Sequence, residues 1–149
     1  MARLIDENFE GTGYEESWAE IVTSGNTLDE DSAIPGIPPF GSAAQCLKAV
    51  FVPGAVNAYA TRTIGDTNIA YIRGYLCISE EGLNNGQNIS TLILGDSSLA
   101  IVAGVVIVQT ADVLKAYFQY YSAGALQSTI QVTVSLNTWY LIEYRYDIT

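Results

Sequence analysis

The segment 139–147, Trp-Tyr-Leu-Ile-Glu-Tyr-Arg-Tyr-Asp, constrains the fold more than any other part of the chain. Its even-numbered residues are all aromatic or aliphatic, whereas Glu143, Arg145 and Asp147 occupy alternate odd positions. Side chains alternate between two faces in a β-strand but repeat every 3.6 residues in a helix, so only a strand separates these two sets. The segment therefore predicts a strand with one face on a core and the other in water.

Segments of the same kind recur along the chain, rich in Val, Ile, Tyr and Thr and separated by short clusters of the turn residues Gly, Asn, Asp and Ser. The clearest strands are expected at Lys48–Val52, Asn57–Thr63, Ile69–Ser79, Thr91–Gly95, Leu99–Gln109, Leu114–Tyr121, Thr129–Ser135 and Trp139–Asp147. Within them, 101–108 is apolar throughout and predicts a strand buried on both faces. Frequent short turns favour an antiparallel sandwich over β-α-β units.

The N-terminal part is less regular. Asn8-Phe9-Glu10-Gly11 followed by Trp18 suits a first strand that packs back on the sandwich, and a helix over Glu15–Val22 is the alternative. We expect Asp29-Glu30-Asp31 to lie in an acidic loop. Ser32–Gly41 holds three of the four prolines and is expected to be a surface connection.

A length of 149 residues suits a single domain, 1–149, that can bury a core without a disulfide or a metal. The spacing of Cys46 and Cys77 fits no zinc pattern, so we expect buried free thiols, with a disulfide between neighbouring strands as the alternative. The apolar run 101–108 is far shorter than the ~20 residues of a membrane-spanning helix. The N-terminus shows no secretion signal, so the protein is not secreted by that route or the signal is already removed.

Charge and composition exclude some functions. The net charge is −10 and the six basic residues are scattered, which argues against nucleic-acid binding. Nine of the sixteen acids lie between Asp6 and Asp31, and they form either a solvated face or part of a cation site. The chain has no histidine, the commonest metal ligand and general base.

No arrangement of residues indicates catalysis. A Ser-His-Asp triad is impossible without histidine, and the glycines lie at separate turns rather than in a phosphate loop. Glu143 and Asp147 share a strand face but lie roughly 13 Å apart at ~3.3 Å per residue. That distance is too long for glycoside hydrolysis, which places two carboxyl groups about 5–9.5 Å apart. The chain is therefore predicted not to be an enzyme and to have no catalytic residue.

Three segments together resemble the concanavalin A-like lectin and glucanase jelly rolls, in particular the laminin-G-like and MAM-like domains. The closing strand 139–147 resembles the laminin-G-like motif, in which Trp begins a strand, an aliphatic residue follows three positions later and Tyr-Asp ends it. Asn8–Gly11 with Trp18 resembles the MAM N-terminal strand, and Ile69–Leu76 resembles the family's central strand. The resemblance implies an all-β, antiparallel jelly-roll β-sandwich on a phage virion or an extracellular cell surface. The Glu-x-Asp-x-x-Glu arrangement of the family's glucanases is absent.

One departure from the family concerns the end of the chain. The family's Tyr-Asp strand is normally followed by a turn and further strands, whereas this sequence stops at Thr149. The sandwich then lacks its last strand, or the chain is a fragment of a longer one. An unpaired edge invites pairing with another chain, and we hypothesise that a neighbouring copy supplies the strand.

The resemblance also implies a structural calcium ion. Jelly rolls of this kind often tie the first strand to the last through Ca²⁺, and Glu10 and Asp147 match the family's positions. Asp6 would join them on the same face of a straight first strand. The alternative is that all three are ordinary acids at strand ends.

The remaining candidates are aromatic. Ten Tyr and two Trp are many for this length, and sugars stack on exposed rings. Tyr117, Tyr120 and Tyr121 lie close together, so at least one of the last two faces outward, and these three are the candidate ligand-binding residues. Two functions stay open: a non-catalytic module for glycan binding or adhesion, and a structural or decoration subunit that associates with particle proteins or its own copies through a sheet edge.

Overall fold

The computed structural model describes residues 18–22, 25–33, 46–50, 58–65, 68–79, 82–96, 98 and 100–147. Every regular element in these ranges is a β-strand, and every strand pair is antiparallel. The predicted all-β, antiparallel class is confirmed, while the jelly-roll connectivity stays a prediction. The chain divides into two compact units, Met1–Asn68 and Ile69–Thr149, which are described separately.

The described residues of the first unit form two small sheets. One pairs β1 (Ala19–Val22) with β4 (Ala58–Thr61), and the other pairs β2 (Thr27–Asp31) with β3 (Cys46–Val50). The loop predicted for Asp29-Glu30-Asp31 is wrong, because these residues belong to β2. The helix considered for Glu15–Val22 is also wrong over its described part, where 19–22 form β1. Asn8–Gly11 and most of Ser32–Gly41 lie outside the described residues.

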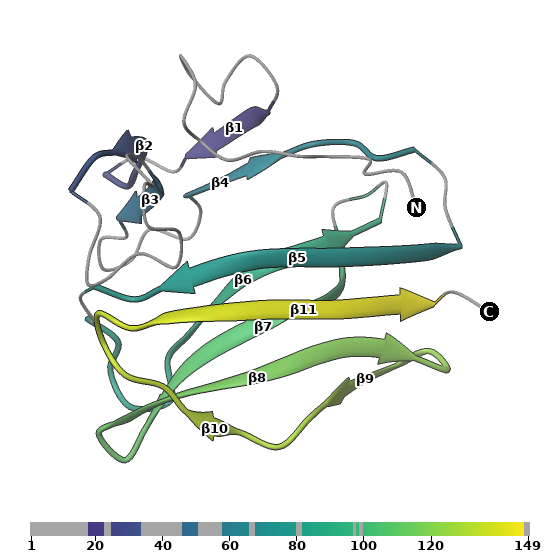
Figure 1. The fold of residues 1–149 in the computed structure, drawn as a ribbon. Coiled ribbons are helices and arrows are strands. Elements are labelled where there is room, and N and C mark those ends of the chain that lie inside the picture. The colour runs from purple at the N-terminus through teal and green to yellow at the C-terminus, as the bar shows by residue number, and fades with distance from the viewer. Residues whose placement is uncertain are drawn as a thin grey trace. The chain divides into compact units, whose positions relative to one another are not determined.

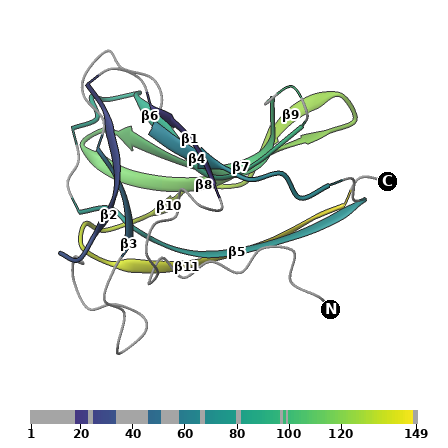
Figure 2. The ribbon, with the colours of Figure 1, turned by 90° about the horizontal axis from the view of Figure 1, so that it is seen from above.

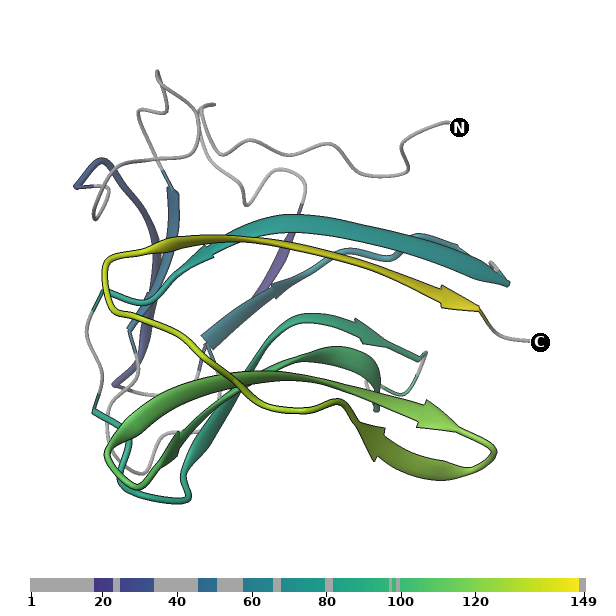
Figure 3. The same cartoon turned by 60° about the horizontal axis from the view of Figure 1, so that its bottom comes forward.

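The described residues of the second unit form two sheets in separate layers (Figures 1, 2 and 3). The smaller sheet pairs β5 (Ile69–Cys77) with β11 (Trp139–Asp147) over nine residue pairs, from Ile69 opposite Asp147 to Cys77 opposite Trp139. The larger sheet has the order β10-β8-β7-β6, with β9 also paired to β8. Its strands are β6 (Asn88–Gly95), β7 (Ile101–Thr110), β8 (Val113–Ser122), β9 (Ala125–Ser128) and β10 (Val132–Thr133).

The core of this unit lies between the two layers. The buried side chains of Val105, Ile107, Leu114, Ala116 and Val134 form one cluster on the larger sheet. Leu76 and Ile78, in and after β5, and Tyr140 and Ile142 of β11 pack against that cluster. The two sheets are therefore the faces of a β-sandwich. The prediction for 101–108 is confirmed at its centre, since every residue from Ala103 to Gln109 is buried.

Tyrosine hydroxyls connect β11 to the backbone of the opposite layer. Tyr144 donates to the Leu92 carbonyl of β6 at 2.7 Å, and Tyr146 donates to the Tyr121 carbonyl of β8 at 3.1 Å. The oxygen of Tyr140 accepts from the Ser135 N–H, after β10, at 2.8 Å. The predicted alternation is confirmed, because from Leu141 to Asp147 odd-numbered residues are exposed and even-numbered residues are partly buried.

A β-bulge bends β6 at the point that Tyr144 contacts. The register with β7 shifts between Thr91 and Leu94, and Leu92 has a positive φ of 47°, which is uncommon for a branched side chain. The Leu92 side chain lies over Gly74 of β5, where an added Cβ would meet its Cδ2 atom at 2.9 Å. Glycine at position 74 therefore leaves room for the bulge.

The remaining strand predictions differ from the structure mainly at their ends. β6 starts three residues earlier than predicted, and β3, β4, β5, β7 and β8 differ by one or two residues at one or both ends. The strand predicted at Thr129–Ser135 is reduced to the two residues of β10. β9 was not predicted, and all four of its side chains are exposed, so it lacks an alternating pattern.

Candidate functional site

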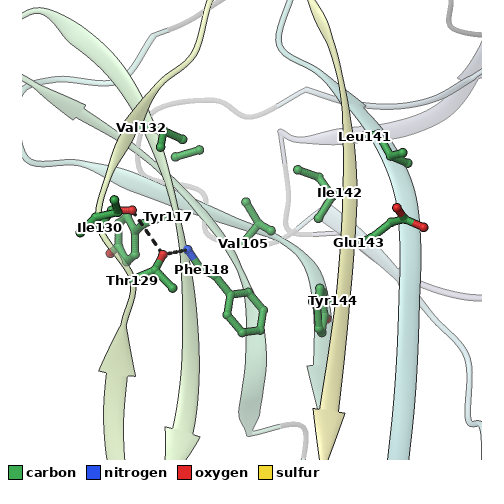
Figure 4. A pocket seen from close by; sticks show the side chains of 11 residues that line it. Val105, Tyr117, Phe118, Thr129, Ile130, Val132, Leu141, Ile142, Glu143 and Tyr144 are labelled. Atoms are coloured by element: carbon green, nitrogen blue, oxygen red, sulfur yellow. Dashed lines mark hydrogen bonds between the residues drawn. The ribbon is translucent and has the colours of Figure 1, made fainter.

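A cleft of about 450 Å³ opens between β11 and the far side of the larger sheet. Figure 4 shows Ile142 and Tyr144 of β11 on one side, with Val105 and Phe118 at its floor. The segment 129–132, between β9 and β10, forms the opposite side. Ligand cavities in proteins span about 300–1,000 Å³, so this cleft is large enough to hold a ligand.

Backbone hydrogen bonds tie the 129–132 segment to β8 in the wall formed by the larger sheet. The Thr129 N–H donates to the Phe118 carbonyl at 2.9 Å, and the Phe118 N–H donates to the Thr129 hydroxyl at 3.0 Å. β9 pairs with β8 beyond this point, and β10 pairs with it on the other side. The far edge of β8 is therefore covered along most of its length.

The wall formed by β11 is different. Within the described residues β11 pairs with β5 alone, so its second edge runs along the cleft beside Leu141–Tyr144. Because each residue in a strand offers one N–H and one C=O, an edge of this kind can pair with a further extended chain. The structure thus combines a strand edge with an apolar hollow beside it.

The rim of the cleft exposes large aliphatic side chains. The exposed fraction is 85% for Ile130, 55% for Val132 and 43% for Leu141. A single exposed aliphatic residue is common on protein surfaces, whereas several of them around one concave site indicate a binding surface. The lining includes one charged side chain, Glu143, whose carboxylate lies 3.4 Å from the Arg73 guanidinium.

The outward face of β11 carries an ordered row of charges next to this site. Glu143 lies opposite Arg73 of β5, and Arg145 forms an ion pair with Asp147 two residues further along the same face. The Arg145 guanidinium also lies over the ring of Tyr71, 5.9 Å from its centroid. The row therefore reads acidic, basic, acidic, and all three side chains lie largely at the surface.

The three tyrosines predicted to bind a ligand are divided between the two faces of β8. Tyr120 lies on the inner face, where its ring stacks on Phe118 with centroids 5.7 Å apart. Tyr117 and Tyr121 lie on the outer face because of the two-residue period of the strand, and Tyr121 is 45% exposed. Tyr117 also contributes to the lining of the cleft. The structure therefore brings two of the three residues to one face.

Of the residues predicted to bind a metal, Asp6 and Glu10 lie outside the described residues. Asp147 ends β11, and its carboxylate forms the ion pair with Arg145. The described part of the chain contains no group of three or more Cys, Asp or Glu that could hold a metal ion. The calcium site stays a prediction.

A second, polar hollow of about 350 Å³ lies in the first unit, lined by residues of β2 and β3 that include Asp29, Asp31 and Lys48. The Lys48 Nζ lies 2.8 Å from Asp31, and the Ala33 N–H also donates to this carboxylate. The Lys48 hydrogen bond, followed by that of Ala33, lowers the pKa of Asp31 below its ordinary value. The acidic segment that was predicted as a loop thus forms an ion-paired strand.

The two cysteines are half-buried free thiols, one in β3 and one at the end of β5. Burial raises the pKa of the Cys46 thiol, whose sulfur donates to the Asp31 carbonyl at 3.6 Å. A thiol with a raised pKa is a poor nucleophile, which fits a packing role for Cys46.

Sequence reasoning did not find the cleft. Its residues come from β7, β8, β11 and the 129–132 segment, and no short motif connects them. The available signal was the pair Ile130 and Val132, two aliphatic residues whose side chains are exposed in a stretch where the strand is reduced to Val132–Thr133.

The described residues contain no helix with the length and apolar character required to cross a bilayer. Comparison of the chain with protein-family models, with curated proteins and with solved structures gave no match.

Proposed function

We propose that this chain is a non-catalytic assembly or adhesion module that binds another polypeptide along the second edge of β11. The observation that carries the proposal is the position of the 450 Å³ apolar cleft directly beside that edge. A polypeptide in β-conformation supplies both backbone groups for the edge and side chains for the hollow, as in strand-addition complexes.

The make-up of the cleft favours a polypeptide over a sugar. The side chains around it are mostly aliphatic or aromatic, with Thr129 and Glu143 as the polar exceptions besides the Tyr117 and Tyr144 hydroxyls. Tyr144 already donates its hydroxyl to Leu92, and Thr129 is hydrogen-bonded to Phe118. A sugar needs many polar side-chain partners, whereas a strand takes its polar partners from the β11 backbone.

A selection from a library of random nine-residue peptides tests this proposal, with the wild-type chain as target and the Ile130→Lys variant as counter-target. The lysine places a charge at the rim of the cleft, and the 85% exposure of Ile130 makes an effect on folding small. Leu126→Lys, on the 50% exposed residue of β9 outside the cleft, is the matched control. Enriched peptides should have apolar residues at alternate positions and should bind wild type and L126K but not I130K. Failure to enrich any peptide with this preference would refute the proposal.

Glycan binding is the second candidate, favoured by the outer face of β8. Tyr117 and Tyr121 share that face with Gln119 between them, which offers aromatic and amide groups to a sugar chain. Tyr121→Ala should then weaken binding on a glycan array, while Tyr120→Phe on the inner face should leave it unchanged. Equal binding by wild type and Tyr121→Ala would exclude this face as the sugar site.

A further inference from the structure

We infer that the β11 edge selects one kind of partner: a single extended segment, antiparallel to β11, that is apolar toward the cleft and carries basic, acidic and basic side chains in order opposite Asp147, Arg145 and Glu143. This inference rests on the proposed function and specifies the chemistry of the partner.

The two faces of β11 define the two rows of the incoming strand. The Cβ atoms of residues directly opposite each other in antiparallel strands lie ~4.5–5.5 Å apart, and the two side chains point to the same face of the sheet. Residues opposite Ile142, Tyr144 and Tyr146 would therefore point toward the opposite layer, which is apolar around Phe118. Residues opposite Glu143, Arg145 and Asp147 would join the exposed charged row.

Charge complementarity determines the outer row. The charges of β11 alternate in sign along this face, so an incoming strand gains attraction at each position only if its own charges alternate in the opposite order. Opposite charges across a strand pair are stabilising, and like charges are destabilising. The net charge of −10 adds a general preference for a partner that is not strongly acidic.

The shape of the second unit argues against a second copy of β11 as the occupant. β8 pairs with β9 and β10 on its far side, so the larger sheet extends beyond the second edge of β11 (Figure 3). A second copy that paired β11 with β11 would bring its own larger sheet into the layer that the first one already occupies. A single strand without a sheet beneath it avoids this collision.

Titration with short peptides tests the inference. The complementary peptide is Lys-Val-Glu-Val-Lys-Val-Thr, and the charge-reversed peptide is Glu-Val-Lys-Val-Glu-Val-Thr, both with blocked termini. Binding is followed through the amide NMR signals of β11. We expect the complementary peptide to bind about tenfold more tightly, because three cross-strand pairs change sign between the two peptides.

A charge exchange across one pair separates local pairing from net charge. Glu143→Lys should bind Lys-Val-Glu-Val-Glu-Val-Thr more tightly than wild type does, since the fifth residue now faces an opposite charge. Asp29→Lys, in the first unit, changes the net charge equally and should have no such effect. The same gain in both variants would overturn the inference.

The remaining outcomes distinguish the inference from the proposed function. If both charge patterns bind equally and Ile130→Lys abolishes both, the charge selection is wrong and edge binding stands. If neither peptide binds and the library yields none, the proposed function itself fails. If the molecular mass in solution doubles as the protein concentration rises, and Ile130→Lys abolishes this doubling, a second copy of the chain is the occupant and the inference is overturned.

Discussion

Replacement of Tyr144 by Phe isolates the contribution of one buried hydroxyl to the packing of the two layers. The substitution keeps the ring, whose centroid lies 4.6 Å from that of Phe118, and removes the 2.7 Å hydrogen bond to the Leu92 carbonyl. Leaving a buried acceptor without its donor costs about 1–3 kcal/mol. Tyr144→Phe should therefore lower the free energy of unfolding of the second unit by that amount at pH 7.

Tyr146→Phe is the matched control. Its hydroxyl donates to the Tyr121 carbonyl at 3.1 Å at an exposed site, where water can replace the lost donor. The expected cost is about 0.5–1 kcal/mol, at the lower end of the range for single hydrogen bonds. A larger loss for Tyr146→Phe than for Tyr144→Phe would refute the reasoning.

The pH dependence gives an independent check on the same group. Burial raises the pKa of Tyr144 above its ordinary value of 10. Below pH 10 the hydroxyl is neutral in both states, so its full contribution to stability is present. Above pH 10 the unfolded chain loses this proton more readily than the folded chain, and the contribution is lost as the pH rises.

At pH 11, one unit above the unfolded pKa, a hydroxyl fully shielded from water would lose about 1.4 kcal/mol of its contribution to the free energy of unfolding. Because the Tyr144 ring is partly exposed, the expected loss is about 1 kcal/mol. The gap in stability between wild type and Tyr144→Phe should therefore narrow by about 1 kcal/mol between pH 9 and pH 11. An unchanged gap would show that water reaches the hydroxyl.

The assay uses the position of the two tryptophans. Trp18 lies in the first unit and Trp139 begins β11, so a Trp18→Phe background leaves a fluorescence signal from the second unit alone. Urea titrations in this background give the free energy of unfolding for each variant by linear extrapolation. Equal m-values across the variants would show that the same cooperative unit is being measured.

Three further substitutions test the fold. Among the described residues, Ile107 is the most deeply buried large side chain, with 1% exposed. Ile107→Ala should cost about 2–5 kcal/mol in urea titrations, whereas Ile130→Ala at the 85% exposed rim should cost almost nothing. Gly74→Ala places a Cβ 2.9 Å from the flexible end of the Leu92 side chain and should lower the free energy of unfolding by about 1 kcal/mol. The double variant Gly74→Ala/Leu92→Ala should recover part of this loss. A single variant as stable as wild type would contradict the close approach. The Asp96 carboxylate accepts hydrogen bonds from the hydroxyl and N–H of Ser98 and from the N–H of Ala100, and these bonds lower its pKa. Its contribution to stability is therefore fully present above the unfolded pKa of 3.8 and is lost as the pH falls through the folded pKa. Asp96→Ala should thus lower the melting temperature at pH 7, and the drop should become smaller as the pH falls toward 2; an equal drop at pH 7 and pH 2 would exclude this role.

The strands that were predicted best from the sequence have one face packed on the core and the other face in water. β11 was predicted with its observed bounds because the even-numbered residues face the core and the odd-numbered ones face water. β2 was missed because Asp29 and Asp31 suggested a solvated loop. In the structure this segment is extended because it pairs with β3, whose Lys48 binds Asp31 from 17 residues further along the chain. No local pattern reveals a partner at that distance.

The candidate site was harder to predict than the fold, because it depends on which strand edges have no partner strand among the described residues. Tyr117, Tyr120 and Tyr121 were grouped by nearness in sequence, but the two-residue period of β8 separates Tyr120 from the other two. The cleft forms where the Thr129 side chain takes the place of a strand partner for Phe118 and leaves Ile130 outside the sheet. Such an interruption follows from tertiary pairing and has no residue signature.

The tyrosine contacts of β11 also determine where the second unit tolerates sequence change. Tyr144 and Tyr146 bond to main-chain carbonyls, and Tyr140 bonds to a main-chain N–H. Every residue type carries a main-chain carbonyl, so the side chain at position 121 is free to change, while the positive φ at position 92 excludes proline there. Any residue except proline at position 135 supplies the N–H. Mutations that preserve the backbone path can therefore accumulate on the larger sheet without removing these bonds, whereas each of the three positions on β11 has one side-chain solution. Over evolutionary time, these three hydrogen bonds between the layers depend on the identity of residues in a single strand.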